Sequence, residues 1–335
     1  MKIDEFGNTK LHIATLNNDV EQKEQLLNDD EKMKEQLLDA NKIKEFIKNN
    51  ENDLIKKFDN LSISISLFQE FLDVAIKYNQ NLIPYIISYM GKNFSENNVF
   101  NAIQYGNKEL FINLNNKFIS KKRMKDHKEY IKNILYKAIY FNKLYVFEEI
   151  FNKNISFSNY MYSLKEEAII LDRIDILKFL FEIEKTVFFK TTDKNIKYFF
   201  HLTIHFKHVE ILQYFIDNGM NVNSVYDRQR PIYRAIITEN CEVIKILAKA
   251  KAELYIKGHS IVKPIEIILN TYAYNNSNYT TNMNEILKVL LTYMKDAEII
   301  DCLKKFKKRD SNIFLKISDT LVVLNKEMNF IHYFI

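Results

Sequence analysis

Two apolar stripes alternate along the chain, and the first of each pair carries a marker residue that is usually alanine. The marker residues are Ala75, Ala102, Ala138, Ala168, Thr203, Ala235 and Ile268. Their average spacing is about 32 residues. Each is followed by a second stripe with helical spacing, and residues 174–180 form a very regular helix face. The pattern predicts repeated pairs of helices that bury their apolar stripes by stacking on neighbouring pairs.

The stretch DEFGNTKLHIATLNNDVEQKEQLL, residues 4–27, contains a more specific motif. Gly7 suits a tight turn, Thr9 suits the N-cap of a short helix, and Ala14 is small where a second helix lies close. The letters GNTKLHIA, residues 7–14, resemble the G-x-T-P-L-H-x-A signature of the ankyrin repeat, with lysine in place of proline.

A second and a third match lie far along the chain. FHLTIHFKHVEILQYFIDNGMNVN, residues 200–223, resembles the rest of the same unit, with His201 and His208 at histidine positions of the family. Another unit begins at Pro231, where Arg228 stands in place of the usual glycine. The resemblance to ankyrin-repeat proteins implies an all-α fold. We expect an ankyrin-repeat solenoid of stacked helix-turn-helix units with degenerate middle repeats and a helical C-terminal cap.

The quality of the resemblance varies, and it divides the chain into five segments. They are an N-terminal ankyrin-like repeat (1–30), a charged helical divergent unit or insert (31–60), degenerate ankyrin-like repeats (61–190), clearer ankyrin repeats (191–295) and a C-terminal helical cap (296–335). Residues 273–284, AYNNSNYTTNMN, are rich in Asn and Thr. They predict an exposed loop inserted in the last recognisable repeat.

The composition excludes some fold classes and indicates the base composition of the genome. The 335 residues include only 5 glycines and 3 prolines, beside 25 phenylalanines and 20 tyrosines. So few turn-formers argue against a β-sandwich or a Gly-rich phosphate-binding fold, and favour helices joined by polar Asn, Asp and Lys turns. The richness in Ile, Lys, Asn, Phe and Tyr also resembles the drift of an AT-rich genome.

Cysteine use and hydropathy bear on the compartment. Cys241 and Cys302 are the only cysteines, too few for a disulfide framework, so a reducing compartment is expected. The polar start MKIDEFGNTK does not have the pattern of a signal peptide. No apolar run approaches the roughly 18 residues needed to span a bilayer. We expect a cytoplasmic, monomeric protein without a membrane span.

The candidate chemistry is sparse. His201, His205 and His208 are close enough in sequence to be tested as a metal site. In the ankyrin resemblance, however, His201 and His208 hold turns together by hydrogen bonds, so we expect no metal. The frames of a phosphate loop, a nucleophile elbow or a zinc protease do not occur in the sequence. We therefore expect a protein that is not an enzyme, with no catalytic residues and no cofactor.

The resemblance implies binding to another protein on the concave surface formed by turn tips and first helices. Carrying the ankyrin pattern onto this sequence gives the expected partner-binding residues: Glu5, Phe6, Asn8, Lys194, Asn195, Lys197, Tyr226, Asp227, Gln229, Ile237 and Thr238. Phe6, Tyr226 and Ile237 would be apolar anchors, and for each the alternative is a partly packed turn residue. The chain also resembles in style the divergent ankyrin proteins of intracellular bacteria, large DNA viruses and protists. That style suggests an effector directed at host proteins.

Two basic runs leave a second hypothesis open. They are KKRMKDHK (121–128) and KKFKKR (304–309), and such runs bind nucleic acid or act as nuclear import signals. The alternative is a solvated loop and a solvated helix face. The net charge of +5 is too small to indicate nucleic acid without a concentrated patch. We therefore expect a protein partner, with a nuclear or nucleic-acid-associated factor as the alternative.

Overall fold

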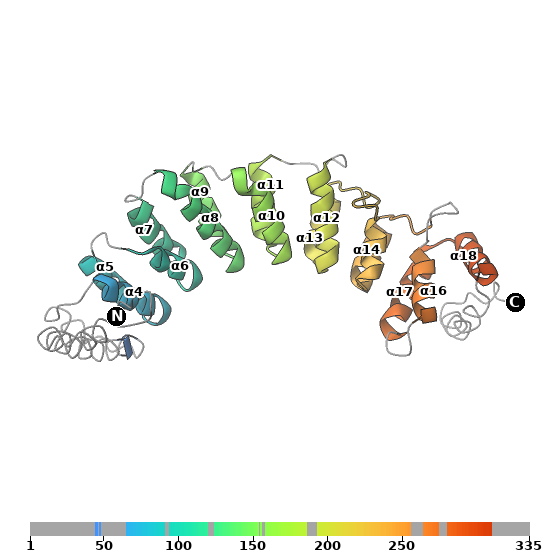
Figure 1. The fold of residues 1–335 in the computed structure, drawn as a ribbon, viewed down its shortest axis with the longest axis horizontal. Helices are drawn as coiled ribbons and strands as arrows, with labels where there is room; N and C mark the ends of the chain where they lie inside the picture. The colour runs from blue at the N-terminus through green and yellow to red at the C-terminus, as the bar shows by residue number, and fades with distance from the viewer. Residues whose placement is uncertain are drawn as a thin grey trace, which may run out of the picture. The chain divides into compact units, whose positions relative to one another are not determined.

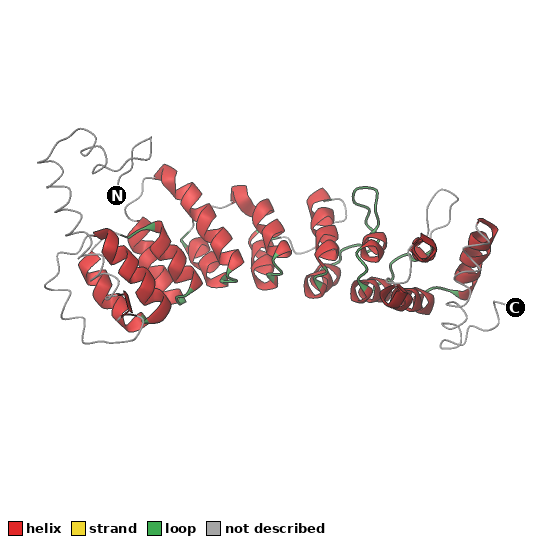
Figure 2. Ribbon diagram, turned by 60° about the horizontal axis from the view of Figure 1, so that its bottom comes forward, coloured by secondary structure: helices red, strands yellow, loops and turns green. Residues whose placement is uncertain are grey.

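The computed structural model describes residues 44, 45, 47, 65–90, 94–119, 124–153, 155, 158–185, 193–255, 264–274 and 280–309. Their regular secondary structure is helical, and Figure 2 shows helices joined by short loops. The one β-bridge in the described part of the chain joins Tyr226 and Gln229. The expected all-α fold is confirmed.

Helices follow one another in pairs, as Figure 1 shows. The first helices are α4 (Ile65–Tyr78), α6 (Glu96–Gln104), α8 (Met124–Tyr140), α10 (Met161–Ile170), α12 (Lys194–Phe206), α14 (Pro231–Ile237) and α16 (Pro264–Tyr274). The second helices are α5 (Ile83–Met90), α7 (Lys108–Ile119), α9 (Leu144–Asn152), α11 (Ile174–Ile183), α13 (Val209–Asp217), α15 (Cys241–Lys249) and α17 (Thr280–Tyr293). A further helix, α18 (Asp296–Arg309), follows the last pair, and two 3₁₀ turns are η2 (Gln80–Leu82) and η3 (Ser158–Tyr160).

The marker residues occupy the position that the sequence pattern predicts. Each of the seven lies in a first helix, and each has none of its surface exposed. In six of the seven pairs the marker is small, which lets first helices pack closely on one another within each unit; Ile268 is the exception. Thr203 fits this site because its hydroxyl donates to the carbonyl of Phe199, 2.9 Å away, within the same helix. The predicted repeat is confirmed over these pairs.

The chain divides into two compact units, Met1–Ser156 and Phe157–Ile335. In the first unit α6 packs against both α4 and α8, and α7 packs on α9. In the second unit α10, α12, α14 and α16 stack in order, α15 packs between α13 and α17, and α18 packs on α16. The break falls inside the segment 61–190 that the sequence pattern treats as continuous.

Bulky aromatic rings fill the space between the helix layers. Phe111, Phe147, Phe181 and Phe215 are completely buried in second helices. Phe181 of α11 meets Phe215 of α13 edge to face, with centroids 5.9 Å apart. Burial of each such ring contributes roughly 1.5–3 kcal/mol. The many phenylalanines therefore stabilise the stack even where the ankyrin signature is lost.

Polar residues replace glycine in the turn between the two helices of several pairs. Asn142, Asp172, Lys207 and Glu239 each follow a marker residue by four positions, and all have positive φ, between 52° and 67°. This left-handed conformation normally favours glycine. The chain can therefore have few glycines and still form these turns, because the fold tolerates the strain of a side chain at these four positions.

Three expectations differ from the structure or lie beyond it. The loop expected at 273–284 is too wide, because α16 continues to Tyr274 and α17 begins at Thr280. The N-terminal repeat (1–30) lies outside the described residues, as does most of the unit or insert at 31–60. Of the cap at 296–335, only α18 is described.

Candidate protein-binding surface

The turn before α14 is a tight hairpin that projects from the second unit. The amide of each bridge residue, Tyr226 and Gln229, donates to the carbonyl of the other at 3.0 Å. The two residues between them, Asp227 and Arg228, have φ values of 49° and 60°. Two consecutive positive φ values are the geometry of a type I′ turn. Arg228 therefore adopts the conformation for which the ankyrin family uses glycine.

His201 connects α12 to the loop before this turn. Its Nε2 donates to the backbone carbonyl of Ser224, 3.1 Å away, and its side chain is buried. The pKa of His201 is lowered to about 4, chiefly by burial; the hydrogen bond to Ser224 opposes this shift, and the nearby positive charge of Arg234 adds to it. The ring is neutral at physiological pH, and its role is structural.

The other two histidines do not join His201 in a metal site. His208 is the N-cap of α13, its Nε2 lies 3.3 Å from the carbonyl of Ile170, and its Nδ1 lies 3.5 Å from Asp172. It therefore contacts the preceding repeat, as the ankyrin resemblance implies. His205 is exposed. The described residues hold no group of three or more candidate metal ligands.

Three tyrosines from successive repeats form a ladder across the first helices of the second unit. The rings of Tyr162 and Tyr198 stack, with centroids 6.1 Å apart and planes 16° apart. Tyr198 in turn contacts Tyr226, with centroids 5.5 Å apart. The hydroxyl of Tyr198 donates to the carboxylate of Glu166. Tyr226 is therefore a half-buried member of a packed row as well as a turn residue.

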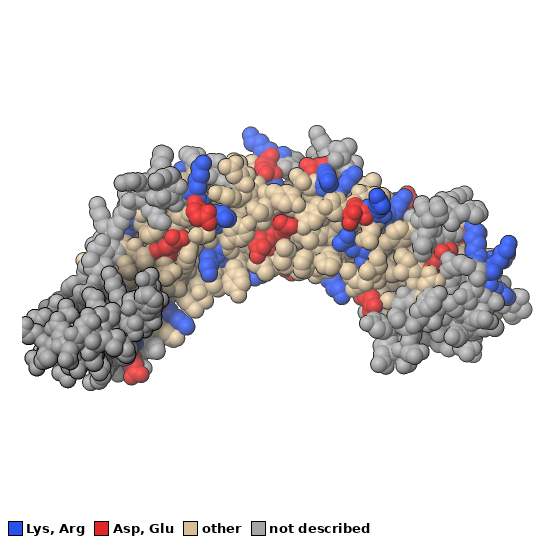
Figure 3. All heavy atoms as spheres, viewed as in Figure 1, with Lys and Arg blue, Asp and Glu red and all other residues tan. Residues whose placement is uncertain are grey.

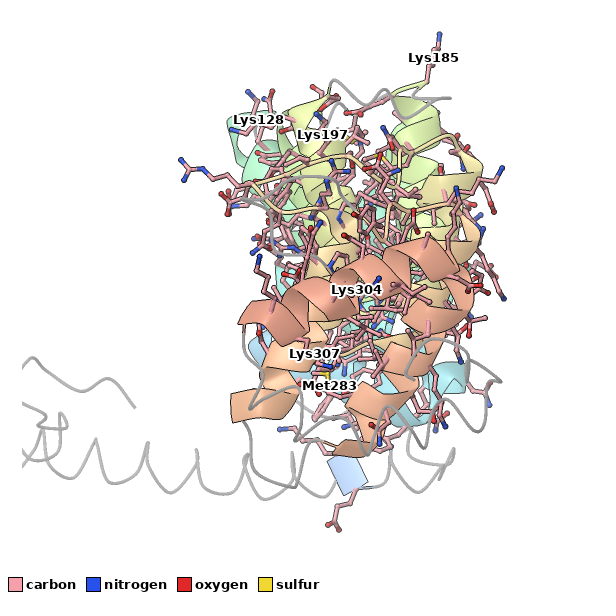
Figure 4. All side chains as sticks on the ribbon, turned by 90° about the vertical axis from the view of Figure 1, so that its right-hand side faces the viewer. Lys128, Lys185, Lys197, Met283, Lys304 and Lys307 are labelled. Atoms are coloured by element: carbon pink, nitrogen blue, oxygen red, sulfur yellow. The ribbon has the colours of Figure 1, made fainter. Side chains whose placement is uncertain are left out.

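The structure divides the expected partner-binding residues between two ends of the first helices. Lys194 and Asn195 are exposed in the first turn of α12, where the carboxylate of Asp193 accepts from the amides of Asn195 and Ile196. Lys197 follows on the same helix, half-buried, and its side chain is labelled in Figure 4. This end of the helices lies near the hairpin.

The hairpin and the C-terminal end of α14 provide the remaining described positions. Asp227 is exposed and Gln229 is half-buried in the hairpin, whereas Ile237 is 60% exposed at the last residue of α14. Thr238 caps that helix and its hydroxyl donates to the carbonyl of Arg234, 3.0 Å away. The two ends of α14 are about 9 Å apart at 1.5 Å per residue. Glu5, Phe6 and Asn8 lie outside the described residues.

A recurring row of exposed apolar residues was missed by the sequence prediction. Each member stands two or three positions after a marker residue, at the C-terminal end of a first helix, and is between 36% and 62% exposed. Each unit has its own part of this row: Tyr78, Tyr105 and Tyr140 in the first unit, and Phe206 and Ile237 in the second. Only Ile237 was predicted. Counting from the marker residue finds the others, but it also finds Ile170, which is only half-buried.

Charges of both signs are mixed over the described surface in the view of Figure 3, with much of it uncharged. On α18 the side chains of Lys304, Lys305, Lys307 and Lys308 are exposed, and Figure 4 labels two of them. Lys305 pairs with Asp301 at 2.8 Å. In the other basic run, Lys128 is exposed on α8.

Within the described part of the chain, every helix is too short or too polar to span a membrane.

Comparison with known proteins agrees with this geometry. The family described as ankyrin repeats (3 copies) matches residues 166–257, which include α11 to α15 and the hairpin. No curated protein matches the chain. Residues 166–257 are ankyrin repeats, a type of protein–protein interaction domain. The chain therefore contains ankyrin repeats over residues 166–257.

Proposed function

We propose that the chain is a non-catalytic scaffold that binds a partner protein on the face made by the ends of its first helices and by the hairpin. The observation that carries this proposal is the row of exposed apolar side chains that recurs two or three residues after the marker residues. Exposed aromatic and aliphatic side chains at fixed register are the type of residue that supplies most interface energy. Ankyrin repeats are typically non-catalytic.

The second unit offers the sharpest test. Ile237 ends the first helix α14, and Val209 begins the second helix α13; both are exposed aliphatic residues. Lysate would be passed over the full chain, the Ile237→Asp variant and the Val209→Asp variant, and captured proteins would be identified by mass spectrometry. We expect Ile237→Asp to lose a protein that both the unmodified chain and Val209→Asp retain. Retention by all three, with unchanged helicity, would show that this face is not the binding surface.

The same experiment bears on location and role. We propose that the chain acts as a monomer in the cytoplasm, and that a captured protein from a host cell would identify it as a host-directed effector. Light scattering tests whether the chain is a monomer, because the mass of one chain is 40.0 kDa.

A nucleic-acid-associated or nuclear factor is the second candidate. It is supported by the exposed lysines at the C-terminal half of α18. Binding to phosphates would weaken steeply with salt, by roughly tenfold or more for a few contacts. Binding through the apolar row would be far less sensitive. Titration of an oligonucleotide at two salt concentrations separates the two candidates.

A further inference from the structure

Two lysines of the first unit converge on helix α6 from opposite sides. The ammonium of Lys77, on α4, lies 5.1 Å from the ring centroid of Tyr105, the residue that caps α6. The ammonium of Lys137, on α8, lies 5.8 Å from the ring centroid of Phe100, within α6. Five residues of helix separate the two rings, a rise of about 7.5 Å. We call these two side chains the α6 lysine pair.

Among the described residues, neither ammonium group of the pair has a carboxylate partner, and each has only aromatic contacts. Lys77 also lies 5.1 Å from the centroid of Tyr78, and Lys137 lies 6.0 Å from that of Phe141. Both lysines are exposed. The phenol of Tyr78, and then that of Tyr105, raise the pKa of Lys77, so its charge persists at physiological pH.

Four other lysines of the same unit are paired with carboxylates. The pairs are Lys44 with Glu70, Lys108 with Glu148, Lys132 with Glu129 and Lys153 with Glu149. Within the described part of the chain, the α6 lysine pair forms no such ion pair. Rings below each ammonium hold it in place by cation–π attraction. The resulting surface has two positioned positive charges that form no ion pair with the carboxylates of the described residues.

Tyr78 and Tyr105 lie beside Lys77, whereas Phe100 and Phe141 lie beside Lys137. Tyr78, Tyr105 and Tyr140 belong to the exposed apolar row described above. A ligand for this surface must therefore carry negative charge between groups that pack on aromatic rings.

We propose that the α6 lysine pair, with the aromatic rings beside it, docks an acidic segment of a partner protein through the carboxylates of that segment. The proposal rests on the proposed function, because it takes the ends of the first helices as the binding face. It adds the chemistry of the partner. Charge complementarity at such a surface fixes register and speeds association.

A single-stranded nucleic acid is the competing anion. Sequence-tolerant binding of that kind needs open ring faces on which bases stack, together with a groove of positive charge that follows the backbone. Here an ammonium group already lies over Tyr105 and another over Phe100. Two cations are also few for a phosphate backbone. The geometry therefore favours carboxylates.

The test uses the full chain and fluorescence anisotropy. The probe is a labelled peptide in which Glu alternates with Thr, and the control peptide has Gln in place of Glu. We expect the Glu peptide to bind more tightly than the Gln peptide. The double variant Lys77→Gln, Lys137→Gln should weaken binding of the Glu peptide about tenfold. A matched double variant, Lys132→Gln with Lys153→Gln, removes two paired lysines from the same unit and should change little.

Three results would overturn the proposal. They are equal affinity for the Glu and Gln peptides, equal loss in both double variants, and tighter binding of an oligothymidine that depends on the same two lysines. Circular dichroism establishes that each variant is folded. If the peptide result is negative while Ile237→Asp still loses a captured protein, the acidic-partner inference fails and the scaffold function stands.

Discussion

The imidazole of His201 on α12 donates a hydrogen bond to the carbonyl of Ser224, which belongs to the loop leading to the next repeat. The ring is buried, and its Nδ1 has no hydrogen-bond partner among the residues that the structure describes. Protonation would place a second donor and a positive charge in that site, near the guanidinium of Arg234. The contact therefore requires the neutral ring.

The first prediction is that His201 makes stability depend on pH. Burial lowers its pKa in the folded protein from 6.5 to about 4. Between these values the unfolded chain binds a proton that the folded chain does not, so the contribution is fully present above pH 6.5 and is lost as pH falls towards 4. Its size is at most about 3 kcal/mol. Urea unfolding of the unmodified chain and of His201→Gln should show a stability difference that shrinks over this range. A constant difference would contradict the prediction.

The second prediction concerns the turn before α13. Lys207 is exposed and has a φ of 67°, a conformation that is strained for any residue with a Cβ. Lys207→Gly should stabilise the protein by about 0.5–1 kcal/mol, after the larger unfolded-state entropy of glycine is subtracted. Lys207→Ala removes the charge but keeps the Cβ, so its melting temperature should stay near that of the unmodified chain. Equal melting of the Gly and Ala variants would show that strain is not released.

The repeat was predictable from sequence because a buried position between helices accepts few residue types. Counting from Ala75 to Ala235 located the first helix of each pair, and Thr203 fitted because its hydroxyl is satisfied within its own helix. The break after Ser156 was not predictable. The apolar stripes continue across the break in the sequence, so the break is visible only in the contacts within each unit.

The binding surface was only partly predictable. Ile237 is exposed as expected, but the ring of Tyr226 packs against Tyr198 of the preceding repeat. A contact between repeats depends on the register of stacking and on side-chain rotamers, which a single motif does not contain. For the same reason, nothing in the sequence placed Lys77 over Tyr105. The site residues remain predictions until a partner is found.

The third prediction is that Asn98 links the first two described repeats. It is completely buried at the start of α6, and its amide nitrogen donates to the carbonyl of Gln69 at 3.1 Å and to the carboxylate of Asp73 at 2.8 Å, both on α4. Its side-chain oxygen accepts from the amide of Ser95 in a capping box. Asn98→Ala leaves these groups without their partner and should lower the free energy of unfolding by about 2–3 kcal/mol. The neighbouring exposed Asn97 provides the control, since Asn97→Ala should shift the urea midpoint very little. A midpoint for Asn98→Ala as high as that of Asn97→Ala would rule out this role.

The fourth prediction concerns Lys165, a charged residue inside the second unit. Its side chain is 5% exposed, it pairs with the carboxylate of Glu184, and its ammonium lies 4.4 Å from the ring centroid of Phe181. Burial of an ion pair often costs as much as the attraction returns, whereas loss of one partner leaves an uncompensated charge. Lys165→Met should therefore be neutral or stabilising, and Glu184→Gln should be destabilising by about 1–3 kcal/mol.

The double variant Lys165→Met, Glu184→Gln tests whether the effect of Glu184→Gln depends on the charge of Lys165. With methionine at position 165 no buried charge needs Glu184, so adding Glu184→Gln to Lys165→Met should change thermal stability by less than about 0.5 kcal/mol. If instead Lys165→Met alone is strongly destabilising, the ion pair stabilises the fold beyond what hydrophobic packing on Phe181 can replace. Additive losses in the double variant would show that Glu184 acts through some contact other than Lys165, because independent sites add while coupled ones do not.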